Sequence, residues 1–112
     1  MTSPICFVEL PARSFAPTRA FYAAAFGMSM TEFGPTYACT LGGGADLGLQ
    51  GDSTEATASP LVVIQVESLE TAEAAVRAAG GAVTKPAFSF PGGRRFHFRD
   101  PSGNELAAMQ AD

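Results

Sequence analysis

The sequence predicts an α+β fold of two βαβββ modules in tandem, whose mixed, curved sheets form an open barrel-like cleft with the helices outside. Three observations support this prediction. Strand-like and helix-like periodicities alternate along the chain. The order strand, helix, three strands occurs twice, and glycine follows each helical stripe. The 112 residues suffice for one domain, comprising module one (residues 1–52) and module two (residues 58–112).

Module one begins with a strand, Ile5–Leu10, whose residues alternate between two faces until Pro11 ends it. Ser14 is placed to cap a helix that runs to Phe26 and stops at Gly27. Three strands are then expected at Met28–Phe33, Thr36–Leu41 and Asp46–Gln50, separated by turns at Gly34-Pro35 and Gly42-Gly43-Gly44.

Module two repeats this order after a linker of small and polar residues, 51–59. A strand at Pro60–Val66 leads to a helix that Ser68 caps and Gly80-Gly81 ends. The rest is expected as a short strand at Ala82–Lys85, a loop to Pro91, and a hairpin of Arg94–Arg99 and Glu105–Gln110 joined by the turn Asp100-Pro101-Ser102-Gly103.

The two modules can be aligned by fixed offsets, which is the signature of an internal repeat. An offset of 54 takes Ser14 to Ser68 and Gly27 to Gly81. An offset of 59, allowing for a longer loop in module two, takes Tyr37 to Phe96. Each single helix can cover one face of its sheet, so the other faces are expected to line a cleft.

Alternation along the strands then divides their side chains into two sets. The expected helix side consists of Cys6, Val8, Leu10, Tyr37, Cys39, Val62, Ile64, Phe96 and Phe98. The expected cleft side consists of Phe7, Glu9, Thr36, Ala38, Leu61, Val63, Gln65, Arg95 and His97. The second set mixes apolar and polar groups, as small-molecule sites do.

Composition excludes several classes of partner. The net charge is −4 and no run of lysine or arginine is present, which argues against nucleic acid. No stretch is long and apolar enough for a membrane, and the N-terminus does not read as a signal peptide, so a cytoplasmic location is expected. Cys6 and Cys39 are expected to be buried thiols, since their spacing suggests neither a disulfide nor a metal site.

The helix motif R-A-F-Y-A-A-A-F-G (Arg19–Gly27) and the ending F-R-D-P-S-G-N-E-L (Phe98–Leu106) combine with the repeat to resemble the vicinal oxygen chelate superfamily. This is the group of glyoxalases, bleomycin-resistance proteins and extradiol dioxygenases, and the resemblance covers nearly the whole chain. It implies the βαβββ fold and, in the enzymes, a divalent metal held by one residue near the start and one in the last strand of each module.

Carried over to this sequence, the four metal-ligand positions fall on Phe7, Gly48, Leu61 and Ala107. None has a side-chain donor for a divalent ion, so we expect no metal and no cofactor. The resemblance is then to the metal-free branch that sequesters bleomycin-type antibiotics. A shifted metal site built from Glu9, Gln50, His97 and Glu105 stays open as an alternative.

The expected function is metal-free binding of a small molecule, such as an antibiotic or another toxic compound. The alternatives are a lyase, isomerase or dioxygenase-like enzyme of the same fold, with Glu9 or His97 as acid or base, and a purely structural or protein-interaction domain. We also expect a homodimer, because open sheet edges invite association and the family's modules commonly pair across a two-fold axis. The ligand-contacting residues are expected to be Phe7, Leu61, Val63, Ala107 and Met109 as apolar wall, and Glu9, Gln50, Gln65, Arg95 and His97 as polar contacts.

Overall fold

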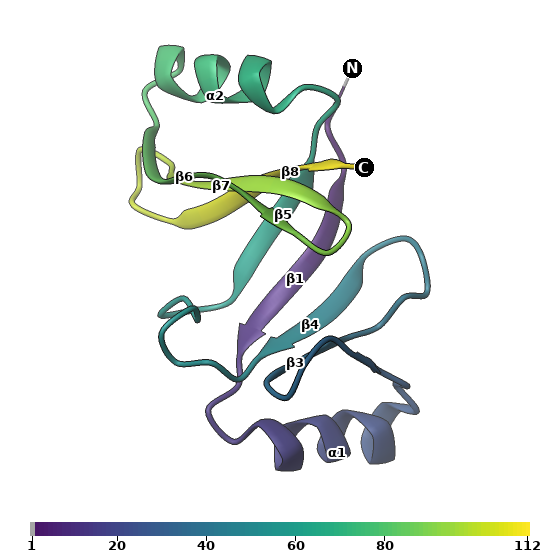
Figure 1. Ribbon diagram of the computed structural model, residues 1–112. Helices are drawn as coiled ribbons and strands as arrows, with labels where there is room; N and C mark the ends of the chain where they lie inside the picture. The colour runs from purple at the N-terminus through teal and green to yellow at the C-terminus, as the bar shows by residue number, and fades with distance from the viewer. Residues whose placement is uncertain (1) are drawn as a thin grey trace. The chain divides into compact units, whose positions relative to one another are not determined.

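A computed structural model describes residues 2–112, and its elements follow the order β1, α1, β2, β3, β4, β5, α2, β6, β7, β8 (Figure 1). This order is βαβββ twice, which confirms the predicted α+β fold class. The chain forms two compact units, residues 7–61 and residues 62–112 together with the N-terminal segment up to Cys6. Within the described residues, neither helix is long and apolar enough to cross a bilayer.

The first unit contains a four-stranded mixed sheet in the order β2-β3-β4-β1. Strand β1 pairs in parallel with β4, whereas β3 pairs antiparallel with both β2 and β4. The bounds of its elements are β1 (Ile5–Pro11), α1 (Phe15–Phe26), β2 (Thr31–Glu32), β3 (Tyr37–Cys39) and β4 (Asp46–Gln50).

Helix α1 packs against a small apolar core in this unit. Ala12, Met30, Ala38 and Leu49 are buried there, with Leu10, Phe15, Tyr22 and Leu47 packed against them. Gly27 ends the helix in the left-handed conformation at φ 68°, as the sequence predicted. Ser14 does occupy the N-cap position, but its side chain makes no capping hydrogen bond.

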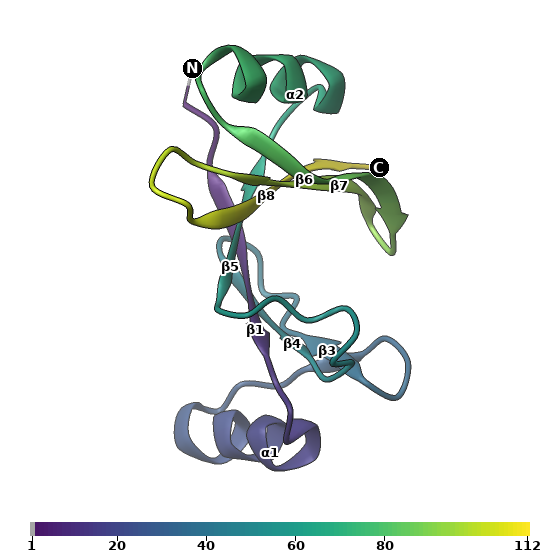
Figure 2. The ribbon, with the colours of Figure 1, turned by 90° about the vertical axis from the view of Figure 1, so that its left-hand side faces the viewer.

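The second unit carries the strand order β5-β8-β7-β6, with β5 and β8 parallel and the other pairs antiparallel. Helix α2 lies over β6, β7 and β8 (Figure 2). The bounds of the elements are β5 (Leu61–Gln65), α2 (Leu69–Ala78), β6 (Ala82–Phe90), β7 (Gly93–Arg99) and β8 (Glu105–Ala111).

The core under α2 is built on Leu69, Phe96 and Ala108, against which Val83 and Phe98 pack. The predicted cap of this helix is confirmed, because the Ser68 hydroxyl accepts the Thr71 N–H at 3.2 Å. The side chain of Gln110 on β8 accepts the N–H of Leu69 at 2.8 Å, which satisfies another free donor of the first turn.

Three predicted strands have the wrong length, among them Thr36–Leu41, of which only Tyr37–Cys39 is a strand, β3. Met28–Phe33 was expected as a strand, but only Thr31–Glu32 pairs, as β2. Strand β6 was expected to end at Lys85 and instead continues to Phe90, through Pro86. Because β6 is an edge strand with register shifts on both sides of Lys85, a proline without an N–H is tolerated there.

The prediction of side-chain faces is wrong for β3. Tyr37 and Cys39 were expected on the helix side, and Thr36 and Ala38 on the other side, but it is Ala38 that packs in the core under α1. The reason is a register difference between the modules. Ala38 corresponds to Phe96, 58 positions later, whereas Leu49 corresponds to Ala108, 59 positions later. Since side chains alternate, one residue of error moves a strand to the opposite face.

Candidate functional site

Each module has one sheet face that its helix does not cover, which we call the helix-free face. Alternation from the core residues identifies its members. In the second unit they include Val63, Arg95, His97, Ala107 and Met109, and in the first unit Phe7, Glu9, Tyr37, Cys39 and Gly48. The predicted placement of Phe7, Glu9, Val63, Arg95 and His97 on these faces is therefore confirmed.

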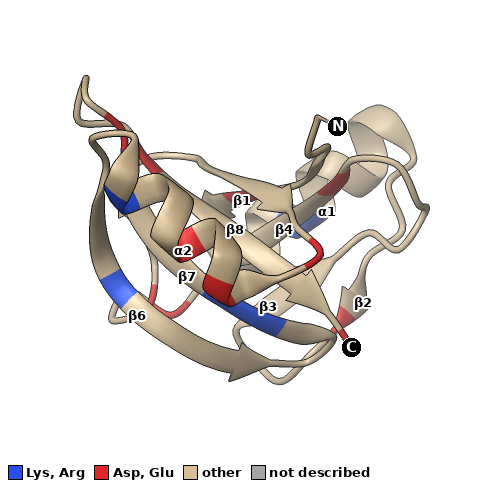
Figure 3. Cartoon of the chain, turned by 90° about the horizontal axis from the view of Figure 1, so that it is seen from above, with Lys and Arg blue, Asp and Glu red and all other residues tan. Residues whose placement is uncertain are grey.

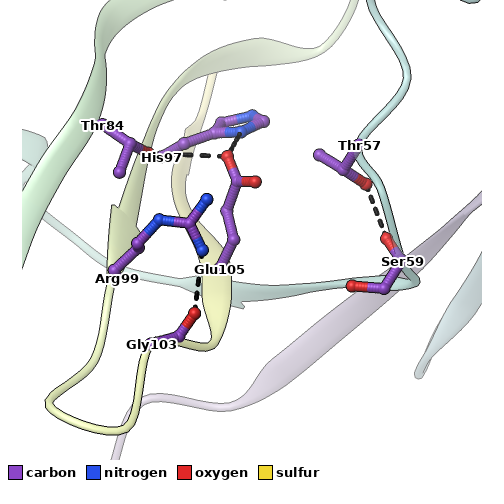
Figure 4. A network of polar contacts seen from close by, with 7 residues as sticks. All are labelled: Thr57, Ser59, Thr84, His97, Arg99, Gly103 and Glu105. Carbon is purple, nitrogen blue, oxygen red and sulfur yellow. Dashed lines mark hydrogen bonds and ion pairs between the residues drawn. The ribbon is translucent and has the colours of Figure 1, made fainter.

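In the second unit the helix-free face is centred on a histidine–carboxylate pair. The Nδ1 atom of His97 on β7 lies 3.1 Å from Oε2 of Glu105 at the start of β8, and the Thr84 hydroxyl lies 3.5 Å from the same oxygen (Figure 4). His97 is only 2% exposed. Its other ring nitrogen, Nε2, is buried and has no hydrogen-bond partner among residues 2–112.

Burial lowers the pKa of His97 below the ordinary value of an imidazole. The hydrogen bond that the ring makes to the Glu105 carboxylate acts in the opposite direction, and the positive charges of Arg95 and Lys85 add to the lowering. The ring is therefore neutral at pH 7. A neutral ring that donates Nδ1–H to the Glu105 carboxylate presents Nε2 as a hydrogen-bond acceptor and as a base.

Aromatic and apolar groups surround this pair. The Phe88 ring lies with its centroid 5.7 Å from that of His97, and Lys85 Nζ lies 4.4 Å from the Phe88 centroid. The Arg95 guanidinium carbon is 5.3 Å from the same ring. Ala107 is the register partner of His97, and Val63 is that of Ala107, so the three share one line across adjacent strands.

In the first unit the helix-free face carries a second buried carboxylate. Glu9 is 1% exposed, and its Oε1 accepts a hydrogen bond from the Tyr37 hydroxyl at 2.7 Å. Tyr37 reaches Glu9 because β3 presents it on this face rather than toward α1. Cys39 lies on the same face. Burial raises the pKa of its thiol, and the negative charges of Asp46 and Glu9 raise it further.

Phe7 fills the space beside Gly48, one of the four positions where the family's enzymes place a metal ligand. A Cβ atom added at Gly48 would lie 2.3 Å from Cζ of Phe7, 2.7 Å from its Cε2 and 2.9 Å from the Tyr37 hydroxyl oxygen. The Phe7 ring thus occupies the place that a side chain at position 48 would take.

The remaining predicted contacts differ in their surroundings. Leu61, Val63 and Ala107 are buried, whereas Met109 is half-buried and Gln65 is exposed. The side chain of Gln50 accepts the N–H of Asp52 at 3.0 Å, so it holds the loop that follows β4. The structure places the buried side chains of Val63, Ala107 and His97 next to one another, with Arg95 and Met109 as register partners beside them.

The sequence did not predict two of the hydrogen-bond partners in the candidate site, Tyr37 of Glu9 and Glu105 of His97. Tyr37 was assigned to the wrong face, and Glu105 was considered only for a shifted metal site. The hairpin could have indicated Glu105. A turn that pairs Arg99 with Glu105 makes Glu105 a diagonal neighbour of His97 on the same face.

The donor chemistry does not fit a divalent metal. Phe7, Gly48, Leu61 and Ala107 offer no side-chain donors. No group of three or more His, Cys, Asp or Glu residues lies together in the described part of the chain. A stable site needs three or more such ligands, so neither the family positions nor a shifted set around His97 supplies one.

One comparison with known proteins identifies the family. A family model described as glyoxalase/bleomycin resistance protein/dioxygenase superfamily matches residues 5–108. No curated protein matches the chain.

Solved structures share the fold at low sequence identity. A hypothetical protein from Bacillus halodurans C-125 superposes with a TM-score of 0.83 at 13% identity, covering 100% of this chain and 96% of that one. Methylmalonyl-CoA epimerase from Mycobacterium tuberculosis gives 0.79 at 14% identity, covering 100% and 92%. A glyoxalase/bleomycin resistance protein/dioxygenase superfamily member from Vibrio splendidus 12B01 gives 0.71 at 17% identity, covering 99% and 100%.

Proposed function

We propose that this chain, which belongs to the glyoxalase/bleomycin resistance protein/dioxygenase superfamily, binds a small organic molecule on the helix-free face of its second unit without a metal ion. One observation carries the proposal, the buried Nε2 atom of His97 that has no partner within residues 2–112. Leaving such a group unsatisfied costs about 1–3 kcal/mol. A ligand that donates a hydrogen bond to Nε2 recovers part of this free energy.

The surroundings of His97 define the class of ligand. Its neutral ring accepts at Nε2, so the ligand carries an O–H or N–H group. The Phe88 ring, Val63 and Ala107 favour a flat, partly aromatic body, with area burial contributing about 25 cal/mol per Å². Phenolic or heteroaromatic antibiotics and toxic compounds fall within this class.

A matched pair of probes tests the proposal. After a thermal-shift screen of antibiotics and aromatic metabolites with and without zinc, phenolic hits are compared with their O-methyl ethers by calorimetry. One net hydrogen bond of about 0.5–1.5 kcal/mol predicts that the phenol binds roughly 2- to 12-fold more tightly. His97→Phe should remove this difference. Arg94→Gln, on the opposite face, should keep it, because Arg94 pairs with Glu70 on α2.

Two outcomes contradict the proposal. If Ala107→Trp, which places a large ring beside His97 in the register, leaves binding of every hit unchanged, the ligand does not occupy this face. If no compound with a donor group stabilises the protein, the helix-free face has no ligand of the proposed class.

The second candidate is an enzyme that uses the same histidine as a general base. The observation that favours it is the His97–Glu105 pair, since a carboxylate that holds Nδ1–H fixes the tautomer and leaves Nε2 to take a proton. Glu9, held by Tyr37, is the corresponding acid or base of the first unit. Mass spectrometry of each bound compound after prolonged incubation distinguishes the two candidates. If the compound is converted by the wild-type protein, and His97→Gln still binds it but no longer converts it, the protein is an enzyme that uses His97.

A further inference from the structure

Two basic side chains lie beside the histidine of the helix-free face in the second unit. The Nζ atom of Lys85 on β6 is 4.4 Å from the centroid of the Phe88 ring, and the guanidinium carbon of Arg95 on β7 is 5.3 Å from the same centroid. The Phe88 ring in turn lies 5.7 Å from the ring of His97, centroid to centroid. We call Lys85, Phe88 and Arg95 the basic end of this face.

Irregular pairing of β6 turns Lys85 toward this end. Val83, two residues earlier on the same strand, packs in the core under α2. Regular alternation would therefore point Lys85 to the core side as well. The register shifts before and after Lys85 instead make it the partner of His97, and they leave Phe88 as the partner of Arg95. Bulges of this kind re-aim a side chain and are frequent beside functional sites.

The two sides of the second unit's sheet differ in charge. On the helix side, each basic residue pairs with a glutamate of α2 (Figure 3), Arg77 with Glu73 and Arg94 with Glu70. The charged strand residues of the helix-free face are Lys85, Arg95, Arg99 and Glu105. The one carboxylate among them already contacts the His97 ring and the Thr84 hydroxyl. This face is therefore basic, although the chain carries a net charge of −4.

The two basic side chains can bind a ligand in addition to their present contacts. Lys85 and Arg95 also interact with other groups of the chain, but an ammonium group has three N–H donors and a guanidinium group has five. Both side chains are half-buried. A partly desolvated charge attracts an opposite charge more strongly than a charge in bulk water does. By the same argument, a cationic ligand would be repelled.

We propose that the small molecule bound on this face is an anion, with its acidic group at Lys85 and Arg95 and a hydrogen-bond donor at Nε2 of His97. This inference rests on the proposed function, because it takes the binding of a ligand at His97 as given. A carboxylate suits the basic end, since it accepts charge-assisted hydrogen bonds from both side chains. The Phe88 ring lies between the basic groups and the imidazole. The two groups of the ligand should therefore lie at opposite ends of one aromatic ring.

Calorimetry with three probes of one shape tests the charge of the ligand. The probes are para-hydroxybenzoate, para-hydroxybenzamide and para-hydroxybenzylamine, which share a phenol and carry a negative, zero and positive charge at neutral pH. Charge-assisted hydrogen bonds are roughly twice as strong as neutral ones, so the benzoate should bind at least about fivefold more tightly than the amide at low salt. The benzylamine should bind more weakly than either. High salt should reduce the preference for the benzoate, because it screens the charges.

Substitutions on β6 and β7 locate the charge. Lys85→Gln should reduce the preference for the benzoate over the amide. Arg95→Gln and Arg94→Gln form a matched pair, because the two arginines are consecutive on β7 and face opposite sides of the sheet. Only Arg95→Gln should reduce the preference. Thermal melting shows whether each variant is folded, and Lys85→Gln decides the test if Arg95→Gln is not.

The inference and the proposed function can fail separately. Equal affinity for the benzoate and the amide, with both weakened in their para-methoxy analogues, overturns the anion and leaves the proposed function intact. A preference for the benzoate that persists in Lys85→Gln and in folded Arg95→Gln places the anion elsewhere and also overturns it, as does a benzoate that fails to bind where a neutral phenol binds. A preference for the benzoate without any difference between hydroxyl and methoxy probes contradicts the bond to His97, and hence the proposed function.

Discussion

Replacing Gly48 with alanine should destabilise the first unit by a predictable mechanism. The added methyl group would come within 2.3 Å of Phe7 Cζ and 2.9 Å of the Tyr37 hydroxyl oxygen, and Cβ atoms in proteins essentially never lie under 3.0 Å from such neighbours. The neighbours must move, and Tyr37 is held in place by its hydrogen bond to the buried Glu9 carboxylate. The Phe7 ring is therefore the group that has to give way.

The size of the loss in free energy of unfolding depends on which atoms the new methyl group meets. Overpacking against side chains that can rotate typically costs about 1–3 kcal/mol, and the closest atoms at Gly48 belong to the far end of Phe7. At Gly93 the added methyl group would instead lie 2.2 Å from the backbone oxygen of Gln110. A backbone atom of the β7–β8 ladder cannot rotate away, so Gly93→Ala should lower the free energy of unfolding more than Gly48→Ala does.

A double-mutant cycle with Phe7→Leu measures the effect. Leucine lacks the Cε2 and Cζ atoms that meet the new methyl group at Gly48, so the double variant should be more stable than the sum of the single changes by about 1 kcal/mol or more. Urea unfolding followed by far-UV circular dichroism gives the four free energies. Strictly additive effects, or a Gly48→Ala variant as stable as the wild type, would refute the packing of Phe7 over Gly48.

Three further predictions concern pH, capping and metal. In the unfolded chain His97 is protonated near pH 6.5, whereas burial lowers its pKa in the folded state, so that the ring stays neutral to lower pH. The free energy of unfolding should therefore fall as the pH drops below about 6.5. Urea titrations of His97→Gln at several pH values should show a smaller dependence of this free energy on pH. Ser68→Ala should cost about 0.5–2 kcal/mol by loss of its bond to the first turn of α2, whereas Ser14→Ala, which loses no such bond, should leave the melting temperature unchanged. Protein purified in the presence of zinc or manganese should carry well under one equivalent by elemental analysis, and about one equivalent lost in Glu105→Gln would contradict the donor argument.

The fold could be predicted because local signals agree with it. Both helix ends coincide with glycine in the left-handed region, Gly27 after α1 and Gly80 after α2, where other residues are strained. The hairpin of β7 and β8 follows from alternation and from the turn at Asp100, which accepts the backbone N–H groups of Ser102 and Asn104.

The errors share a physical cause, which is that register depends on loop geometry. Residues 40–45 join β3 to β4, whereas residues 100–104 join β7 to β8, one fewer. A single offset fitted to the last strands therefore misplaces Tyr37 and Cys39 by one position and assigns them to the wrong face. The Tyr37–Glu9 pair could not be predicted for this reason, although both residues had been recognised as parts of strands.

The site could be predicted in part. His97 and Glu9 could be identified because alternation along their strands places both on the sheet face that the helices leave uncovered, and both prove to be buried and hydrogen-bonded. The unsatisfied Nε2 atom of His97 could not be foreseen, since it depends on the positions of all its neighbours. The filled space above Gly48 likewise depends on the rotamer of Phe7.

The packing of Phe7 over Gly48 constrains the order in which this chain could change by mutation. A histidine or glutamate introduced at position 48 alone would meet the aromatic ring before it could reach any ion. A smaller residue at position 7 would have to come first, and by itself it would only remove the packing of the Phe7 ring over Gly48. At least two substitutions, one at position 7 and one at position 48, therefore separate this chain from a donor side chain at position 48, and steric contact sets the order in which they can occur.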